Sequence, residues 1–257
     1  MIIDTHTHLY DAAFDADRAD MVKRAKESGV GLMLLPAIDR SSFRAMWQTV
    51  NAFPEVMKPM IGLHPCSVKA QSMVAELELV ESELKTRRDN YVAIGEIGID
   101  LYWDKSTIDR QREAFRVQLQ WARQFELPVA IHIRNSFNEV FDVLQEEQDG
   151  TLTGVLHCFT GGKRHVRLAR ELGFYMGIGG VVTYPGSGLD HMLKRIEMHE
   201  IVLETDAPYL APVPRKSERN EPAFLMHIAS RVAEIKQVPL DEVIAITSAN
   251  AQKLFML

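Results

Sequence analysis

The feature that most constrains the fold of this chain is a regular alternation of short apolar runs with longer amphipathic stretches. Eight runs are rich in apolar or β-branched residues, and helical sequence follows each of them. These runs span residues 2–6, 31–37, 57–63, 91–97, 129–131, 154–156, 174–178 and 201–203. Strict alternation of strands and helices is typical of a parallel sheet, because each parallel connection needs a crossover.

About eight strand–helix units in 257 residues fit the size of a (β/α)8 TIM barrel, an α/β fold. An open, doubly wound sheet is the competing architecture, since its strands and helices alternate in the same way. No linker, repeat or break in composition marks a boundary within the chain. We therefore expect a single domain over residues 1–257.

The helices that follow the runs have recognisable boundaries. They are expected at residues 17–27, 42–53, 73–87 and 240–255. The clearest helix follows the fourth run, where Ser106 and Asp109 predict a capping box. One face of that helix carries Phe115, Leu119, Ala122 and Phe125. Residues 208–222 contain four prolines and predict an extended loop after the last strand.

Composition excludes several classes of protein. The net charge of −6 argues against a protein that coats long nucleic acid through its overall field, although it permits an enzyme that takes one phosphodiester into a pocket. Two cysteines, Cys66 and Cys158, are too few for a disulfide framework. The apolar stretches are too short for a membrane span, and the start lacks the pattern of a secretory signal. We expect a cytoplasmic protein that does not enter membranes.

Polar residues that bind metals recur where the predicted strands end. The carboxyl ends of barrel strands meet at one mouth, where catalytic residues are found. One histidine there is often a structural residue, and one Asp is often a helix N-cap. The whole set indicates a shared site, and its members are His6, His8, His64, Glu96, His132, His157 and Asp206. The other histidines, His165, His191, His199 and His227, lie in helical or loop sequence and are expected to be structural.

Four imidazoles and two carboxylates in one pocket need a cation, because the carboxylates otherwise repel each other and lose solvation. The strand-end histidines offer the imidazoles, and Glu96 and Asp206 offer the carboxylates. Six ligands exceed the three that one catalytic zinc usually takes, so we expect two divalent metal cations with Glu96 as the bridge. Mixed nitrogen and oxygen ligands fit Zn, Mn, Co or Fe better than Mg, and sequence does not select among these ions.

Motifs along the whole chain resemble those of the TatD-type metal-dependent deoxyribonucleases of the amidohydrolase superfamily. They are DTHTH at 4–8, GLHP at 62–65, GEIGID at 95–100, LPVAIHIR at 127–134, HCFTG at 157–161, LETDAPYL at 203–210, RNEP at 219–222 and NAQKLF at 250–255. The resemblance implies a TIM barrel and hydrolysis of DNA ends from the 3′ side, a 3′–5′ exonuclease activity.

The resemblance also implies how the ligands divide between the two metals. The first metal would be held by His6, His8 and Asp206. The second would be held by His132 and His157, with Glu96 joining the two. In the predicted mechanism a metal-bound water, with its pKa lowered by the cations, attacks phosphorus in line with the leaving oxygen.

Individual side chains have predicted roles in this scheme. Asp206 is the general-base candidate, and the alternative is a plain ligand without a proton role. Glu204, two residues earlier, is expected to support the ligands rather than to bind metal. His64 and Arg134 are assigned to substrate phosphate. The alternatives are a structural role for His64 and a rim salt bridge for Arg134.

Further residues near the expected mouth have two interpretations. Glycines and basic residues at 161–165 open a helix, where free N–H groups suit a phosphate, or they form a solvated basic face. The same alternatives apply to Arg215, Lys216 and Arg219. Cys158 is expected to point away from the mouth, because it follows His157 directly on a strand. Cys66 is expected near the mouth, with a metal contact as its minor alternative.

The predicted function is thus a divalent-metal-dependent deoxyribonuclease that acts on DNA ends or another phosphodiester substrate. The chief alternative uses the same metals on a carboxylic ester or amide, as in an aminoacyl-tRNA deacylase or a lactonase. A barrel that binds a partner without catalysis is the third possibility. No obligate protein partner is inferred.

Overall fold

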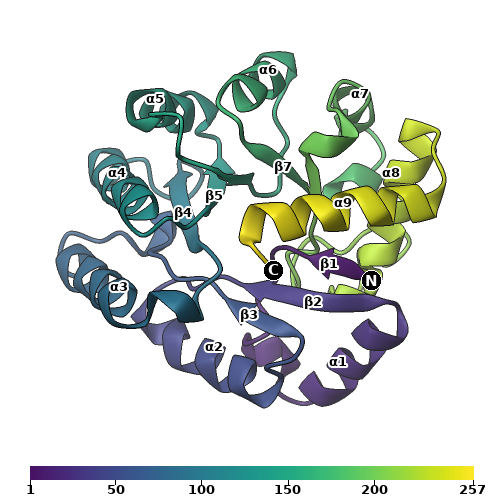
Figure 1. The fold of residues 1–257 in the computed structure, drawn as a ribbon, viewed down its shortest axis with the longest axis horizontal. Helices are drawn as coiled ribbons and strands as arrows, with labels where there is room; N and C mark the ends of the chain where they lie inside the picture. The colour runs from purple at the N-terminus through teal and green to yellow at the C-terminus, as the bar shows by residue number, and fades with distance from the viewer.

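The computed structural model describes residues Met1–Leu257 and contains eight strands surrounded by helices (Figure 1). The strands are β1 Ile2–Asp4, β2 Val30–Leu35, β3 Met57–Pro59, β4 Ile94–Asp100, β5 Val129–Arg134, β6 Gly154–Leu156, β7 Tyr175–Ile178 and β8 Ile201–Leu203. The helices are α1 Arg18–Glu27, α2 Arg40–Ala52, α3 Met73–Arg87, α4 Ile108–Gln124, α5 Phe137–Glu147, α6 Lys163–Glu171, α7 Leu189–Leu193, α8 Leu225–Lys236 and α9 Leu240–Phe255. None of them has the length and apolar character needed to cross a membrane.

The strands are parallel and follow one another in chain order, in one group from β1 to β3 and another from β4 to β8. A parallel bridge between Ile61 and Ile94 joins the two groups on one side. On the other side, the Thr5 N–H donates to the Leu203 carbonyl at 3.0 Å, which joins the ends of β1 and β8. These links favour the predicted TIM barrel over an open, doubly wound sheet.

A layer of apolar side chains fills the interior of the barrel. The strands and the residues directly beside them contribute Ile3, Leu34, Met60, Ala93, Ala130, Val155 and Val202, and α9 adds Ala251, Leu254 and Phe255. Ala93, Ala130, Val155 and Val202 each precede a site residue of the same strand unit, namely Glu96, His132, His157 and Asp206, so this layer lies on the amino-terminal side of the site. Figure 1 shows α9 running across the strands beside both chain termini. The helix therefore covers the amino-terminal end of the barrel and leaves the carboxyl end open to solvent.

Helix boundaries agree with the sequence pattern to within two residues. Helix α2 shows the largest shift among the predicted ranges, because it begins at Arg40 after the N-cap Asp39 and ends at Ala52, whereas the sequence predicts 42–53. Helices α3 and α9 have the predicted bounds, and α1 begins one residue after its N-cap residue Asp17. The capping box predicted at Ser106 is wrong, because α4 begins only at Ile108. The Ser106 hydroxyl instead donates to Asp104 at 2.6 Å. This local turn competes with the helix for the same side chain.

Two strands extend further toward the mouth than the pattern predicts. Strand β4 continues four residues past Glu96, and β5 runs to Arg134. Asp100 is paired with Arg134 across the two strands. The paired ends of β4 and β5 thus carry polar residues. A search for apolar runs does not predict strand structure there. By contrast, β1 ends at Asp4, so His6 and His8 lie in the segment that follows the strand.

Candidate metal centre

A cavity of about 610 Å³ opens at the carboxyl end of the barrel. Seven of the predicted site residues line it, namely His8, His64, Glu96, His132, Arg134, His157 and Asp206. His6 is fully buried, and its ring contacts those of His8 and His157. The fold therefore brings all the predicted site residues together, although their origins span almost the whole chain.

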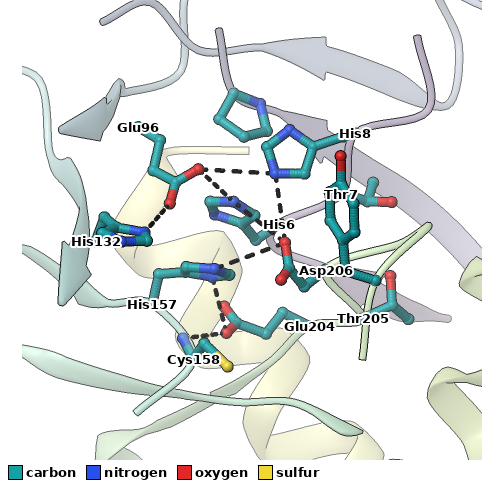
Figure 2. A network of polar contacts seen from close by, with 12 residues as sticks. His6, Thr7, His8, Glu96, His132, His157, Cys158, Glu204, Thr205 and Asp206 are labelled. Atoms are coloured by element: carbon teal, nitrogen blue, oxygen red, sulfur yellow. Dashed lines mark hydrogen bonds and ion pairs between the residues drawn. The ribbon is translucent and has the colours of Figure 1, made fainter. Parts of the chain in front are cut away.

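Glu96 occupies the centre of this cluster and is almost fully buried. Its Oε2 lies 3.2 Å from His6 Nε2 and 3.7 Å from His8 Nε2. Its Oε1 lies 2.7 Å from Nδ1 of His132. Figure 2 shows Glu96 between His132 on one side and the two amino-terminal histidines on the other. Burial alone would raise the pKa of Glu96, but His64, His6 and His132 hold it well below its usual value. The carboxylate is therefore charged.

Asp206 faces the same histidines from the end of β8. Its Oδ1 lies 3.3 Å from His8 Nε2 and 3.9 Å from His6 Nε2 (Figure 2). Burial raises the pKa of Asp206, but the neighbouring imidazoles of His157 and His8 bring it below its usual value. Ligands at 2.0–2.2 Å from a tetrahedral zinc lie roughly 3.3–3.6 Å apart. The separations around His6, His8, Glu96 and Asp206 run from 3.2 to 3.9 Å, which is close to that spacing.

The unpartnered nitrogens of His6 test whether this cluster fits a metal. Neither ring nitrogen of His6 has a hydrogen-bond partner, although the residue is fully buried. Burial and the nearby His157 lower the pKa of His6, so its ring is neutral and retains a lone pair. A buried polar atom without a partner is costly, and a bound ion removes that cost. The donor set of imidazoles and carboxylates therefore fits a divalent cation.

Tyr10 orients His8 and was not identified from the sequence. The Tyr10 hydroxyl donates its one proton to the Pro36 carbonyl at 2.7 Å. Its oxygen must then accept from Nδ1 of His8, at 3.0 Å. This arrangement leaves Nε2 of His8 unprotonated toward Glu96 and Asp206, and such outer partners commonly fix the tautomer of a metal-binding histidine.

Glu204 supports His157 from beneath the site. Its Oε1 lies 2.9 Å from Nδ1 of His157, while Nε2 of the same ring lies 3.7 Å from Asp206. Burial alone would lower the pKa of His157, but the charges of Glu204 and Asp206 raise it to about 10. Glu204 is itself fully buried and also accepts from the backbone N–H of Cys158. This position is compatible with the supporting role that the sequence predicts for Glu204, and that role stays a prediction.

Asp100 holds the far side of His132 and is the main site residue that sequence analysis missed. Its Oδ2 lies 2.9 Å from Nε2 of His132, whose Nδ1 faces Glu96. Burial alone would raise the pKa of Asp100, but bonds from His132 and from the Tyr102 and Trp103 N–H groups lower it to about 2. Glu96 and Asp100 are separated by an even number of positions on one strand, so their side chains share a face. This spacing could have pointed to Asp100 from the sequence.

His64 has the hydrogen bonding of a donor rather than of a metal ligand. Its Nδ1 accepts from the backbone N–H of Cys66 at 3.1 Å, so in the neutral ring Nε2 carries the proton. Burial lowers the pKa of His64, which favours that neutral form. Nε2 of His64 lies 3.3 Å from Nδ1 of His132 and 3.4 Å from Glu96 Oε1, at the wall of the cavity. This geometry suits the predicted contact with a substrate oxygen.

The ligand atoms fall into three compact groups. Within each group the atoms lie within 4.8 Å of one another, and the groups are His6–His8–Asp206, His6–His157–Glu204 and His64–Glu96–His132. The first group, His6–His8–Asp206, contains the three ligands predicted for the first metal. It does not include Glu96, which is predicted to join the two metals. No group holds both His132 and His157, so the division of ligands at the second metal stays a prediction.

Arg134 ends β5 at the rim of the cavity. Its guanidinium carbon lies 3.9 Å from the centre of the Tyr102 ring. No carboxylate lies within ion-pair distance of it, so the rim salt bridge considered for Arg134 is not formed. It is also the only Lys or Arg among the residues that line the cavity.

The prediction for Cys158 is wrong, because this residue lines the cavity. β6 ends at Leu156, and Cys158 has a left-handed backbone with φ of 46°, so strand alternation no longer sets its direction. Cys66 lies at the mouth as expected.

The basic segments lie outside the cavity. None of residues 161–165 lines it, and His165 accepts the Gly162 N–H through Nδ1 at 3.1 Å. Arg219 pairs with Asp17 at 2.7 Å, and Arg215 pairs with Glu218 at 3.1 Å. The four histidines expected to be structural are absent from the cavity wall as well. The basic residues of these segments therefore do not reach the cavity that holds the predicted ligands.

We predict that Asp100→Asn weakens divalent-metal binding by about 10–100-fold, because a neutral amide holds His132 less firmly. Competition with a chromophoric chelator measures the affinity. Asp104→Asn, which changes an exposed carboxylate in the next turn, is the matched control and should bind metal as the parent does. Parent-like affinity in Asp100→Asn would remove Asp100 from the support of the site.

Comparisons with known proteins agree with this geometry. The family model described as "TatD related DNase" matches residues 3–256. An uncharacterized metal-dependent hydrolase, YabD of Bacillus subtilis, is 34% identical, and the match covers 99% of both chains. A protein of Rahnella sp. named 3'-5' ssDNA/RNA exonuclease TatD is 36% identical over 97% of this chain and 96% of its own. The crystal structure of YjjV, a TatD homologue from Escherichia coli, superposes with a TM-score of 0.93 at 28% identity, covering 100% of this chain and 98% of that one.

Proposed function

The chain belongs to the TatD-related DNase family of metal-dependent hydrolases, and from this premise we propose that it removes nucleotides from the 3′ ends of DNA. The observation that carries the proposal is the buried Glu96 carboxylate, which faces imidazole nitrogens on both of its oxygens at the end of an open cavity. The exonuclease name of the Rahnella relative supports phosphodiester chemistry. We further propose a single domain, residues 1–257, that acts in the cytoplasm.

We assign two divalent cations to this centre, with His6, His8 and Asp206 for one and His132 and His157 for the other. Glu96 would join them, since each of its oxygens faces a different group of imidazoles. When bound, such ions supply Lewis-acid stabilisation of phosphoryl oxygens and activate water for attack. The protein supplies the fixed geometry, because Tyr10, Asp100 and Glu204 hold the outer nitrogens of three of the histidines.

Asp206 is the proposed general base. Its carboxylate is charged, and it is partly exposed to the cavity, unlike Glu96 beneath it. It can therefore accept a proton from the attacking water at the point where substrate enters. We assign the His64 Nε2–H and the Arg134 guanidinium as donors to the phosphate oxygens. Nδ1 of His64 accepts from Cys66, which leaves Nε2 as the donor of the ring, and Arg134 has no carboxylate partner.

The test combines metal analysis with hydrolysis assays across Zn, Mn, Co and Mg. We expect about two ions per chain and release of nucleotides from a single-stranded DNA labelled at its 5′ end, with full activity lost on chelation and regained on adding metal. A parallel panel of aminoacyl-tRNA, lactone and amide substrates tests the alternative. Hydrolysis of one of these esters without cleavage of DNA would overturn the nuclease assignment, and metal-free protein that stays inactive with every ion would overturn both.

A further inference from the structure

Two aromatic side chains stand exposed at the rim of the cavity. Tyr102 is 53% exposed and Trp103 is 70% exposed, in the turn that follows β4. Their rings pack edge to face with centres 4.9 Å apart, and Trp103 lines the cavity. A large apolar ring held open to solvent beside an active site indicates a surface that a ligand covers.

This aromatic turn is fixed relative to the metal centre. Asp100 Oδ1 accepts the backbone N–H groups of Tyr102 at 2.9 Å and of Trp103 at 3.2 Å. The other oxygen of the same carboxylate lies 2.9 Å from His132. Gln111 of α4 bonds both the N–H and the carbonyl of Asp100. One buried carboxylate therefore joins the aromatic turn to a predicted metal ligand, so the distance between them cannot vary freely.

Arg134 adds a positive charge to this surface. Its guanidinium stacks over the Tyr102 ring at 3.9 Å and lies 5.5 Å from the centre of the Trp103 ring. Because no carboxylate pairs with it, the charge is available to an incoming anion. Proteins that bind single-stranded nucleic acids commonly combine aromatic rings with Arg side chains. The rings stack on the bases, and the Arg side chains pair with the phosphates.

We propose that Tyr102, Trp103 and Arg134 form a rim subsite that binds an unpaired nucleobase beside the phosphodiester to be cut. The base stacks on the Trp103 indole, and Arg134 pairs with the adjoining backbone phosphate. This inference rests on the proposed nuclease function and adds a specificity element to it. A base inside a duplex already stacks on both neighbours, so the subsite selects single-stranded ends over paired ones.

The test measures the affinity of two strands that differ only in their bases. The first is a short oligothymidylate with cleavage-resistant phosphorothioate linkages at its 3′ end, and the second has abasic residues at its two terminal positions. Trp103→Ala should raise the Kd for the first strand about tenfold, and should leave the Kd for the abasic strand unchanged. Trp103→Phe should restore most of the affinity for the first strand, because it retains a stacking face.

Val74→Ala is the control, because Val74 is also an exposed apolar residue, at 63% against 70% for Trp103, and lies on α3 away from the cavity. It should bind both strands as the parent does, and the Tm of each variant checks that it folds. A Trp103→Ala protein that binds both strands like the parent, while the parent cleaves DNA, would overturn the subsite and leave the nuclease function standing. A parent that neither binds nor cleaves any strand would overturn the nuclease function together with the subsite.

Discussion

Glu96→Gln is expected to lower kcat/KM for cleavage of DNA 3′ ends by at least about 10³-fold, which corresponds to roughly 4 kcal/mol. The substitution keeps the shape of the side chain but removes the charge that faces His6, His8, His64 and His132. The Gln side chain also replaces one of the two Glu96 carboxylate oxygens with an NH₂ group, which cannot bind a metal ion. We therefore expect a lower metal content together with the loss of activity.

Metal analysis and steady-state kinetics measure this result on the same preparation. Glu113→Gln changes an exposed glutamate of α4 that has no ion pair, and it should behave as the parent does. The Tm separates a catalytic defect from unfolding. If Glu96→Gln retained parent-like kcat/KM and bound two ions, Glu96 would lose its place at the centre of the site.

Asp206→Asn is expected to lower kcat by about 10²–10⁴-fold, because an amide cannot accept the proton of the attacking water. The readout that distinguishes a base from a plain ligand is the split between kcat and metal affinity. As a base, Asp206 affects kcat when the ions are saturating. As a plain ligand, it affects mainly the metal concentration needed for half activity.

Asp109→Asn, at an exposed position on α4, controls for the loss of one negative charge and should leave both quantities unchanged. Activity of Asp206→Asn close to that of the parent, with both metals bound, would remove Asp206 from the chemistry and leave it as a ligand at most.

The architecture was predictable because the alternation of runs is dictated by burial. Strands enclosed on both faces must be apolar, and their crossover helices must be amphipathic, so eight units are visible in the sequence. The barrel rule then places polar residues from the carboxyl ends of the strands at one mouth. For this reason the sequence alone groups His6, His132 and Asp206.

The contacts that orient these residues could not be predicted in the same way. Asp100 lies in a part of β4 where the apolar pattern has already ended, and only the strand register reveals its contact with His132. Tyr10 acts through the direction of one hydroxyl proton, which depends on the Pro36 carbonyl in another segment. Cys158 turns into the cavity because of a left-handed backbone that residue type does not specify at cysteine. Each of these depends on three-dimensional placement rather than on pattern.

Because α9 and the apolar layer seal one end of the barrel, the molecule is shaped like a cup and not like a tube. A polymer cannot be threaded through it, and whatever reaches Glu96 must leave by the opening through which it came. In the proposed exonuclease reaction, the freed nucleotide would leave through the same opening by which the next chain end enters, so the first would have to depart before the second arrives.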